Sequence, residues 1–235
     1  MEKREKIYEG KAKVLYATED PNFLIQYFKD DATAFNAQKR GTIREKGLLN
    51  NQISSTLFQF LEGAGIETHF VRTLGEREML VKRLEILPIE VVVRNIVAGS
   101  LSQRLGLPEG TPLAGTILEF YYKRDDLGDP MINEYHIRAL GLATEEEMAR
   151  VSAMALRINV LLQPFLEKRG LRLIDAKYEF GRYEGRILLG DEISPDGCRF
   201  WDMETDEKMD KDRFRRDLGR VEEVYQEVWR RVCAA

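Results

Sequence analysis

Alternating apolar and polar positions predict strands along much of the chain. Residues 6–8, 12–16 and 23–28 alternate in this way and are separated by turn sequences around Gly10 and Pro21, which predicts an antiparallel meander. We expect further strands near residues 68–72, 78–83, 89–93, 117–123, 172–180 and 186–189. The last two of these form a hairpin around Gly185, because a glycine-containing turn separates them.

Apolar residues at helical spacing predict three long helices. The first covers residues 46–61 and ends at Gly63, and a short helix is expected after Ser100. The second covers residues 144–169, where Thr144 and Glu147 form a capping-box pattern and Gly170 supplies the stop. The third covers residues 211–232, with an inward stripe of Phe214, Leu218, Val221, Tyr225 and Trp229. Because strands and helices mix without βαβ alternation, the predicted fold class is α+β.

Three charged residues interrupt the apolar run at residues 173–181. Successive strand side chains point to opposite faces, so Asp175, Lys177 and Glu179 share one face and each lies about 6.5 to 7 Å from the next. Two carboxylates that flank an ammonium could hold a divalent cation beside an anionic substrate. The alternative is a polar sheet face with a salt-bridged lysine.

Composition narrows the functional classes. The chain has 235 residues, enough for one large domain or two lobes around a cleft. With 36 basic and 40 acidic residues, its formal net charge is −4, which disfavours bulk attraction to nucleic acid or to an anionic membrane. An anionic substrate must therefore be bound by local clusters of lysine and arginine.

Few residues are available for other kinds of site. The cysteines Cys198 and Cys233 form no C-x-x-C pair, so neither structural zinc nor a disulfide framework is expected. His69 and His136 give little material for a histidine-rich metal site or a catalytic triad. The charged start lacks the apolar segment of a signal peptide, and no run is long enough to span a membrane. We expect a cytoplasmic protein.

Two segments could bind phosphate. Residues 9–13 place Gly10 and two lysines between strands, where backbone amides can approach an anion, although an ordinary hairpin turn explains the same sequence. Arg94 precedes Gly99 and Ser100 at the start of the predicted short helix. Ser100 as N-cap, free helix amides and Arg94 could bind a phosphate together. A capped helix with a buried Glu90–Arg94 ion pair is the alternative.

Carboxylates also follow the predicted strand at residues 186–189. Asp191 and Glu192 leave its end, and Asp191 could complete a magnesium pocket with Asp175 and Glu179; a polar loop is the alternative. Residues 29–36 and 46–51 could line the same cleft, although turns and caps explain most of their polar positions.

Several motifs in order resemble the phosphoribosylaminoimidazole-succinocarboxamide synthase (SAICAR synthetase) family. Residues 87–100 fit its first signature and residues 173–181 its second, and supporting segments occur at residues 8–13, 129–134, 190–197 and 209–215. The resemblance covers essentially the whole chain. It implies a two-lobed fold, with an N-terminal antiparallel sheet lobe (residues 1–84) and a larger C-terminal α+β lobe (residues 85–235) around an ATP cleft.

The resemblance also implies an activity. The reaction joins L-aspartate to the carboxylate of carboxyaminoimidazole ribonucleotide, consumes ATP and releases ADP and phosphate in purine biosynthesis. ATP with Mg²⁺, the ribonucleotide and L-aspartate are then the expected ligands, with no nucleic acid and no membrane as partner, and a homodimer is the expected assembly.

Site roles follow from the same resemblance. ATP is expected to contact the following residues: Gly10, Lys11, Ala12, Lys13, Val81, Lys82 and Leu84. The metal ligands are expected to be Glu179 and Asp191. Arg94, Ser100 and Arg199 are expected to bind the ribonucleotide, with Lys123 and Asp129 as further substrate contacts. The reacting carboxylate is expected to lie near Glu90, Asp175 and Lys177.

Two other classes of protein share part of this pattern. A different ATP-dependent ligase or small-molecule kinase would share the nucleotide residues but not the combination of Arg94, Gly99, Ser100 and Arg199. A non-catalytic nucleotide-binding module would lack a second anion site and a second metal-competent carboxylate.

Overall fold

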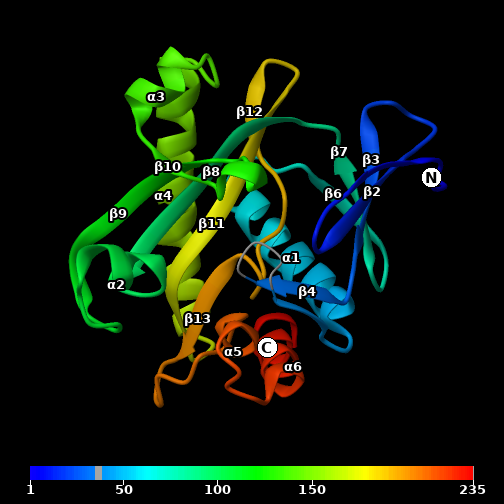
Figure 1. The fold of residues 1–235 in the computed structure, drawn as a ribbon. Coiled ribbons are helices and arrows are strands. Elements are labelled where there is room, and N and C mark those ends of the chain that lie inside the picture. The colour runs from blue at the N-terminus through cyan, green and yellow to red at the C-terminus, as the bar shows by residue number, and fades with distance from the viewer. Residues whose placement is uncertain (35–38, 235) are drawn as a thin grey trace.

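Two antiparallel sheets form the framework of the chain (Figure 1). The computed structural model describes residues 1–34 and 39–234. The first sheet has the strand order β1-β2-β3-β7-β6, and its strands are β1 (Lys6–Glu9), β2 (Lys13–Ala17), β3 (Phe23–Phe28), β6 (Phe70–Gly75) and β7 (Glu78–Lys82). The predicted N-terminal meander is thus confirmed.

The second sheet has the order β10-β9-β8-β11-β12, and β13 pairs with β11 as well. Its strands are β8 (Glu85–Ile96), β9 (Pro112–Tyr122), β10 (Met131–Ile132), β11 (Leu171–Tyr183), β12 (Arg186–Leu189) and β13 (Cys198–Asp202). The predicted β11–β12 hairpin is confirmed, and Glu184 and Gly185 at its turn both have positive φ. A separate hairpin pairs β4 (Asp31–Ala34) with β5 (Lys39–Thr42).

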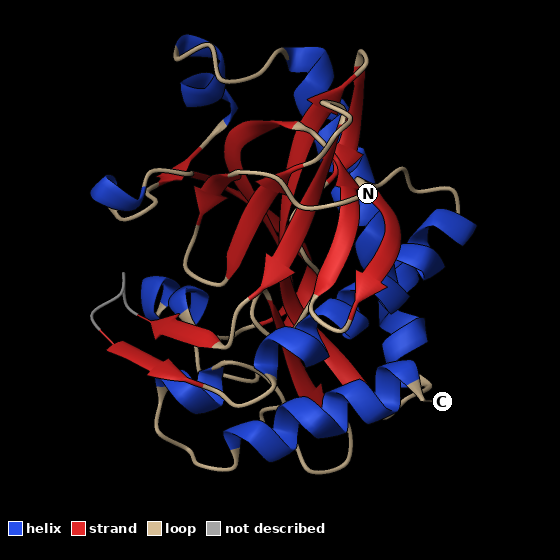
Figure 2. Cartoon of the chain, turned by 90° about the vertical axis from the view of Figure 1, so that its right-hand side faces the viewer, coloured by secondary structure: helices blue, strands red, loops and turns tan. Residues whose placement is uncertain are grey.

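The first two of the three predicted long helices lie where the apolar periodicity places them. Helix α1 (Lys46–Gly63) packs on β3, β6 and β7 and also against α6 (Val221–Cys233), as the views in Figures 1 and 2 show. Helix α4 (Glu145–Glu167) covers one face of β8 and β11. The predicted capping box forms, since the Thr144 side chain accepts from the backbone of Glu147 and the Glu147 side chain accepts from that of Thr144. The shorter helices are α2 (Ser100–Leu105), η1 (Asp125–Leu127), α3 (Glu134–Ala139) and α5 (Asp212–Arg215).

The prediction of one continuous C-terminal helix is wrong. The backbone at Asp217, Gly219 and Arg220 has positive φ, so the right-handed helix ends after α5 and restarts at Val221. The Arg213 guanidinium donates to the carbonyls of Leu218 and Gly219 and stabilises this break. Leu218, predicted to face inward, is 44% exposed, whereas the Tyr225 side chain is fully buried.

Sequence patterns missed the shorter elements. The β4–β5 hairpin, β10, α3 and β13 have too few residues for a clear periodicity. Of the segment predicted to line the cleft, Phe35 and Asn36 lie outside the described residues. Helices α1 and α4 and strands of both sheets share the largest apolar core. Because α4 covers one face of β8 and β11, the opposite face is left for polar chemistry.

Candidate active site

The charged face predicted for residues 173–181 exists and faces away from α4. On β11, Asp175 pairs across the sheet with Arg94, Lys177 with Val92 and Glu179 with Glu90, so these side chains project from one face. Ile174, Ala176, Tyr178 and Phe180 alternate with them and are buried. The period-two pattern therefore places charges from two strands side by side.

A cavity of about 270 Å³ opens on this face. Its lining residues come from β8, β9, β11 and β13, from helices α2 and α5, and from loops, and they are Glu90, Val92, Arg94, Ser100, Tyr121, Asp129, Asp175, Lys177, Asp196, Gly197, Cys198, Arg199 and Arg215. All three residues expected near the reacting carboxylate are among them. So are all the expected ribonucleotide contacts except Lys123.

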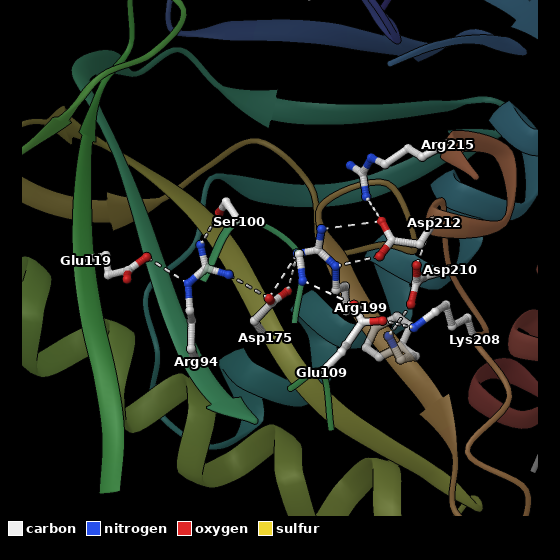
Figure 3. Close-up of polar contacts among 12 residues, drawn as sticks. Arg94, Ser100, Glu109, Glu119, Asp175, Arg199, Lys208, Asp210, Asp212 and Arg215 are labelled. Carbon is white, nitrogen blue, oxygen red and sulfur yellow. Dashed lines mark hydrogen bonds and ion pairs between the residues drawn. The ribbon is translucent and has the colours of Figure 1, made fainter. Parts of the chain in front are cut away.

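Arg94 is the buried centre of the polar network at one end of the cavity (Figure 3). Its guanidinium donates to Glu119 (Nε–Oε2 2.7 Å), Asp175 (Nη1–Oδ2 2.9 Å), Ser100 (Nη2–Oγ 3.0 Å) and Tyr121 (Nη2–OH 3.2 Å). The Glu90–Arg94 ion pair considered from the sequence is absent from the described network, because Glu90 pairs with Lys177 instead. Burial by itself would lower the pKa of Arg94. The charges of Asp175 and Glu119 outweigh burial, so the pKa of Arg94 is raised.

Ser100 does not cap helix α2. The N-cap is Gly99, and the Ser100 hydroxyl accepts from Arg94 instead. Gly99 has φ 52°, a conformation that favours glycine, and a Cβ there would overlap the Arg199 guanidinium. The close approach of Gly99 to Arg199 explains why a glycine stands before this helix.

Arg199 is a second arginine that lines the cavity, and Asp175 bridges it to Arg94. Arg199 Nη1 donates to Asp175 at 2.9 Å (Oδ2) and 3.2 Å (Oδ1). Its Nε donates to Asp212 at 2.8 Å. Burial lowers the pKa of Arg199, but Asp175 and Asp212 outweigh it and raise it above its usual value. Both arginines therefore stay charged, with their positions set by carboxylates.

Lys177 stands between two carboxylates of the same face. Its Nζ lies 2.6 Å from Glu90 Oε1 and 3.3 Å from Glu179 Oε1. Burial lowers the pKa of this ammonium, but Glu179 and Glu90 outweigh it and raise it well above the ordinary value. Lys177 is thus an ammonium at neutral pH and suits charge stabilisation better than proton abstraction.

The two expected metal ligands, Glu179 and Asp191, lie beside the cavity. Phe180 and Leu189 are paired in the β11–β12 ladder, and the Gly190 N–H donates to the Glu179 carbonyl at 2.8 Å, so the two carboxylates leave neighbouring strands. Glu179 forms an ion pair with Lys123, and Asp191 with Lys13.

Lysines control the charge of Asp191. Burial raises the pKa of this carboxyl, but Lys13, Lys177 and Lys123 outweigh it and hold it well below its usual range. Burial lowers the pKa of Lys13, but Asp191 and Glu192 outweigh it and raise it above its ordinary value. The pair therefore stays ionised at neutral pH.

This donor set fits Mg²⁺ carried by a nucleotide. The described residues contain no cluster of three or more metal-ligating side chains. Mg²⁺ in phosphoryl-transfer sites is usually held by one or two carboxylates, with phosphate oxygens and water completing its shell. Glu179 and Asp191 supply such a pair, and the nearby lysines carry charge suited to phosphate.

The hairpin around Gly10 reaches toward the second sheet. The Gly10 N–H donates to the Lys13 carbonyl at 2.9 Å and closes the turn, with Lys11 and Ala12 between them. Lys11 Nζ lies 2.6 Å from Asp125 of η1. Lys11 thus contacts the segment after β9, and Lys13 contacts the loop after β12. The hairpin therefore lies beside Glu179 and Asp191.

The segment expected to contact adenine packs through Leu84 against Gly181 and Gly190, which lie near Glu179 and Asp191 in the sequence. A Cβ at Gly181 would lie 2.7 Å from the Leu84 Cβ, and one at Gly190 would lie 3.0 Å from Leu84 Cδ1. The Val81 side chain is buried in the core. The backbone N–H of Lys82 donates to the His69 carbonyl at 2.7 Å, so this N–H already has an acceptor within the protein.

Sequence reasoning missed several residues of the site. Tyr121, Asp196 and Arg215 line the cavity, and Asp212 contacts two of its arginines. Asp196 is held by Lys46 at 2.7 Å and by the Tyr225 hydroxyl at 2.7 Å, which links the cavity to α1 and α6. The motif at residues 209–215 contained Asp212 and Arg215, but nothing in its spacing distinguished them from other charges of a short helix.

Cys198, His69 and His136 lie in different surroundings. Cys198 is buried, and burial raises the pKa of its thiol above the usual range. His69 is buried in the core, and His136 is exposed and caps α3 by accepting from the Asn133 N–H at 3.1 Å.

Comparison with known proteins identifies the family. The SAICAR synthetase family model matches residues 6–232. A phosphoribosylaminoimidazole-succinocarboxamide synthase of Novosphingobium aromaticivorans is 60% identical over 99% of this chain and 90% of its own. The crystal structure of such an enzyme from Ehrlichia chaffeensis has a TM-score of 0.96 at 48% identity, covering 98% of this chain and 99% of its own. A type-2 SAICAR synthetase in complex with ADP has a TM-score of 0.94, also at 48% identity, and covers 97% of both chains.

Fold and relatives together define a carbon–nitrogen ligase. The fold is the α+β architecture expected from the resemblance, with two antiparallel sheets and helices packed on them. The chain belongs to the SAICAR synthetase family, and the resemblance inferred from its motifs is confirmed. In the part of the chain that the structure describes, no helix has the length and apolarity needed to cross a membrane.

Proposed function

We propose that the cavity on β8 and β11 binds the ribonucleotide substrate and that ATP binds beside it, at Glu179 and Asp191. The chain is an ADP-forming ligase of purine biosynthesis. It joins L-aspartate to the carboxylate of carboxyaminoimidazole ribonucleotide and converts ATP to ADP and phosphate.

One observation carries the placement of the ribonucleotide. A single cavity gathers three arginines, Arg94, Arg199 and Arg215, at one side and Lys177 with Glu90 at another. Arginine binds phosphate through several N–H donors, which suits the phosphate of the ribonucleotide. Ser100 and Asp129 line the same space and supply further polar contacts.

The placement of ATP is supported by the lysines that surround Glu179 and Asp191. Lys13 and Lys123 pair with these carboxylates, and Lys11 approaches from the hairpin at Gly10. ADP bound to the type-2 relative shows that a protein of this fold accepts the nucleotide product. Mg²⁺ held by Glu179, Asp191 and the nucleotide would neutralise phosphate charge during transfer. On this placement, the nucleotide lies between the strands of residues 1–84 and those of residues 85–235.

The chemistry requires an activated carboxylate. A carboxylate is unreactive toward an amine, so transfer of the ATP γ-phosphoryl group first gives an acyl phosphate, which the aspartate amine then attacks with loss of phosphate. Lys177 is an ammonium between Glu90 and Glu179 and stabilises the charge on the transferring group. Glu90 and Asp175 position Lys177 and Arg199, respectively, around the reacting carboxylate.

We also propose a cytoplasmic homodimer. The two cysteines are free, which suits a reducing compartment. The homodimer follows from the family resemblance, and sedimentation at several protein concentrations tests it.

ADP release from ATP tests the function. With the carboxylated ribonucleotide and L-aspartate both present, we expect stoichiometric formation of ADP, phosphate and the amide product. Sustained ADP formation with the ribonucleotide and no aspartate would instead indicate a small-molecule kinase. Nucleotide binding without turnover under any of these conditions would indicate a binding module.

A further inference from the structure

Asp212 contacts two of the cavity arginines at once (Figure 3). Its carboxylate accepts from Arg199 (Nε–Oδ2 2.8 Å, Nη2–Oδ1 3.3 Å) and from Arg215 (Nη1–Oδ1 2.6 Å). Both guanidinium groups line the cavity, whereas Asp212 is 1% exposed and lies behind them. Two like charges that converge on one space repel each other unless a carboxylate lies between them.

The position of Asp212 is itself fixed by a buried neighbour. Asp210 accepts the Asp212 N–H at 2.7 Å (Oδ1) and the Phe200 N–H at 3.1 Å (Oδ2). Phe200 follows Arg199 on β13, so Asp210 ties the first residue of α5 to the strand that carries Arg199. On its other side the Arg199 guanidinium packs against Gly99. Arg199 is thus held between Gly99, Asp175 and Asp212.

We infer that Asp212 is a positioning residue for the ribonucleotide: its buried carboxylate holds Arg199 and Arg215 in the orientation that binds the anionic group. This inference rests on the proposed function of the cavity. Arg215 depends on Asp212 more than Arg199 does, because Asp175 also holds Arg199. Loss of the Asp212 charge would therefore release Arg215 and leave Arg199 on one partner, while the ATP-side carboxylates Glu179 and Asp191 keep their own lysines.

The test is Asp212→Asn, which keeps the side-chain size and removes the charge. We expect the KM for the ribonucleotide to rise by about tenfold or more, as for loss of charge-assisted contacts. The KM for ATP and kcat at saturation should stay within about twofold, because binding in the ground state and the transition state is weakened alike. Calorimetric titration with the ribonucleotide should show the same loss of affinity, and Asp212→Glu should restore part of it.

A matched control is Arg216→Ala. Arg216 Nη2 lies 3.7 Å from the same carboxylate, but it pairs bidentately with Glu109 and is not among the cavity-lining residues. This variant should leave the KM for the ribonucleotide unchanged. The double variant Asp212→Asn with Arg215→Ala completes a double-mutant cycle. If Asp212 acts through Arg215, its loss of binding free energy for the ribonucleotide should be clearly smaller than the sum of the losses in the two single variants.

The outcomes separate this inference from the proposed function. If Arg199→Ala leaves ribonucleotide binding unchanged, the cavity is not the ribonucleotide site and the proposed function of the cavity is wrong. If Arg199→Ala weakens ribonucleotide binding and Asp212→Asn does not, only the role of Asp212 is overturned. An equal rise in both KM values, or a lower melting temperature with unchanged KM, would make Asp212 merely structural. If Asp212→Asn does not fold, Asp212→Glu takes its place, because it shifts the carboxylate by one methylene and must still affect the ribonucleotide alone.

Discussion

Single side chains set the charge of this site through their neighbours. Lys177 is the clearest case, because the alternation of β11 places it between Glu179 on its own strand and Glu90 on the next. Both carboxylates keep it protonated, and it lines the cavity in which we place the reacting carboxylate. The interaction of this ammonium with the transferring phosphoryl group becomes stronger as charge develops on that group in the transition state.

We predict that Lys177→Met binds both substrates and slows the chemical step. The expected result is a large fall in kcat with a modest change in either KM, because the lost contact is strongest in the transition state. Steady-state kinetics and calorimetry with an ATP analogue and the ribonucleotide measure the two effects separately. Lost binding with normal kcat at saturation would make Lys177 a positioning residue instead.

Burial gives His69 a measurable effect on stability. Burial, with Lys13 and Lys82 nearby, outweighs the opposing effect of Asp191 and lowers the pKa of His69 to about 3. Below pH 6.5 the unfolded chain binds a proton at His69 that the folded chain does not bind. The contribution of His69 to the free energy of unfolding is therefore fully present above pH 6.5 and is lost as the pH falls toward 3. At pH 5 the loss is about 2 kcal/mol.

We predict that His69→Gln flattens this pH dependence. Urea unfolding at pH 5, 6 and 7 should show a slope reduced by up to about 1.4 kcal/mol per pH unit. An unchanged slope in His69→Gln would show that His69 binds protons equally in the folded and unfolded chains, so that burial does not lower its pKa.

At the scale of elements, local signals decide where helices begin and where they break. The Thr144 capping box satisfies backbone donors at the start of α4, which covers the second sheet. The break before α6 is marked locally as well, because Gly219 interrupts the predicted helix and adopts a positive φ. The Arg213 side chain, only five and six residues earlier, donates to the carbonyls of Leu218 and Gly219.

We predict that Thr144→Ala destabilises the protein by about 1 kcal/mol, because the Glu147 N–H loses its acceptor. The melting temperature should fall by about 2–4 °C for a chain of this size. Ser152→Ala lies inside the same helix, away from its cap, and should not lower the melting temperature. Equal effects of the two substitutions would contradict a capping role.

At the scale of the molecule, charged residues join the two sheets beside the proposed nucleotide site. Lys13 from β2 pairs with Asp191 after β12, and Lys11 next to β2 pairs with Asp125 after β9. Within the second sheet, Lys123 after β9 pairs with Glu179 on β11. The proposed nucleotide site therefore draws its residues from both sheets. Its carboxylates are held by lysines in the free protein, and a magnesium nucleotide would supply new partners for both.

We predict that Glu179→Gln nearly abolishes turnover while the fold is retained. The substitution removes one of the two metal-competent carboxylates, and circular-dichroism melting should remain close to wild type. ADP formation measured across a magnesium titration tests this. Glu184→Gln, in the exposed turn of the same hairpin, should retain activity. Near-normal activity of Glu179→Gln at ordinary magnesium would refute the metal assignment.

The sequence alone determined the features that depend on near neighbours. Period-two alternation placed Asp175, Lys177 and Glu179 on one face, and the Thr144 motif marked the start of α4, because strand pleating and helix capping are local. Motif order along the chain also indicated the family and the activity.

Only the tertiary structure decided which charges meet. Arg94 pairs with Asp175 across 81 positions, and Arg199 pairs with Asp175 across 24, so no local period could match them. Asp212 and Arg215 were ordinary charges of a short segment until β13 brought Arg199 beside them. Partner choice between buried charges depends on sheet register and chain packing, which bring together side chains that the linear pattern leaves far apart.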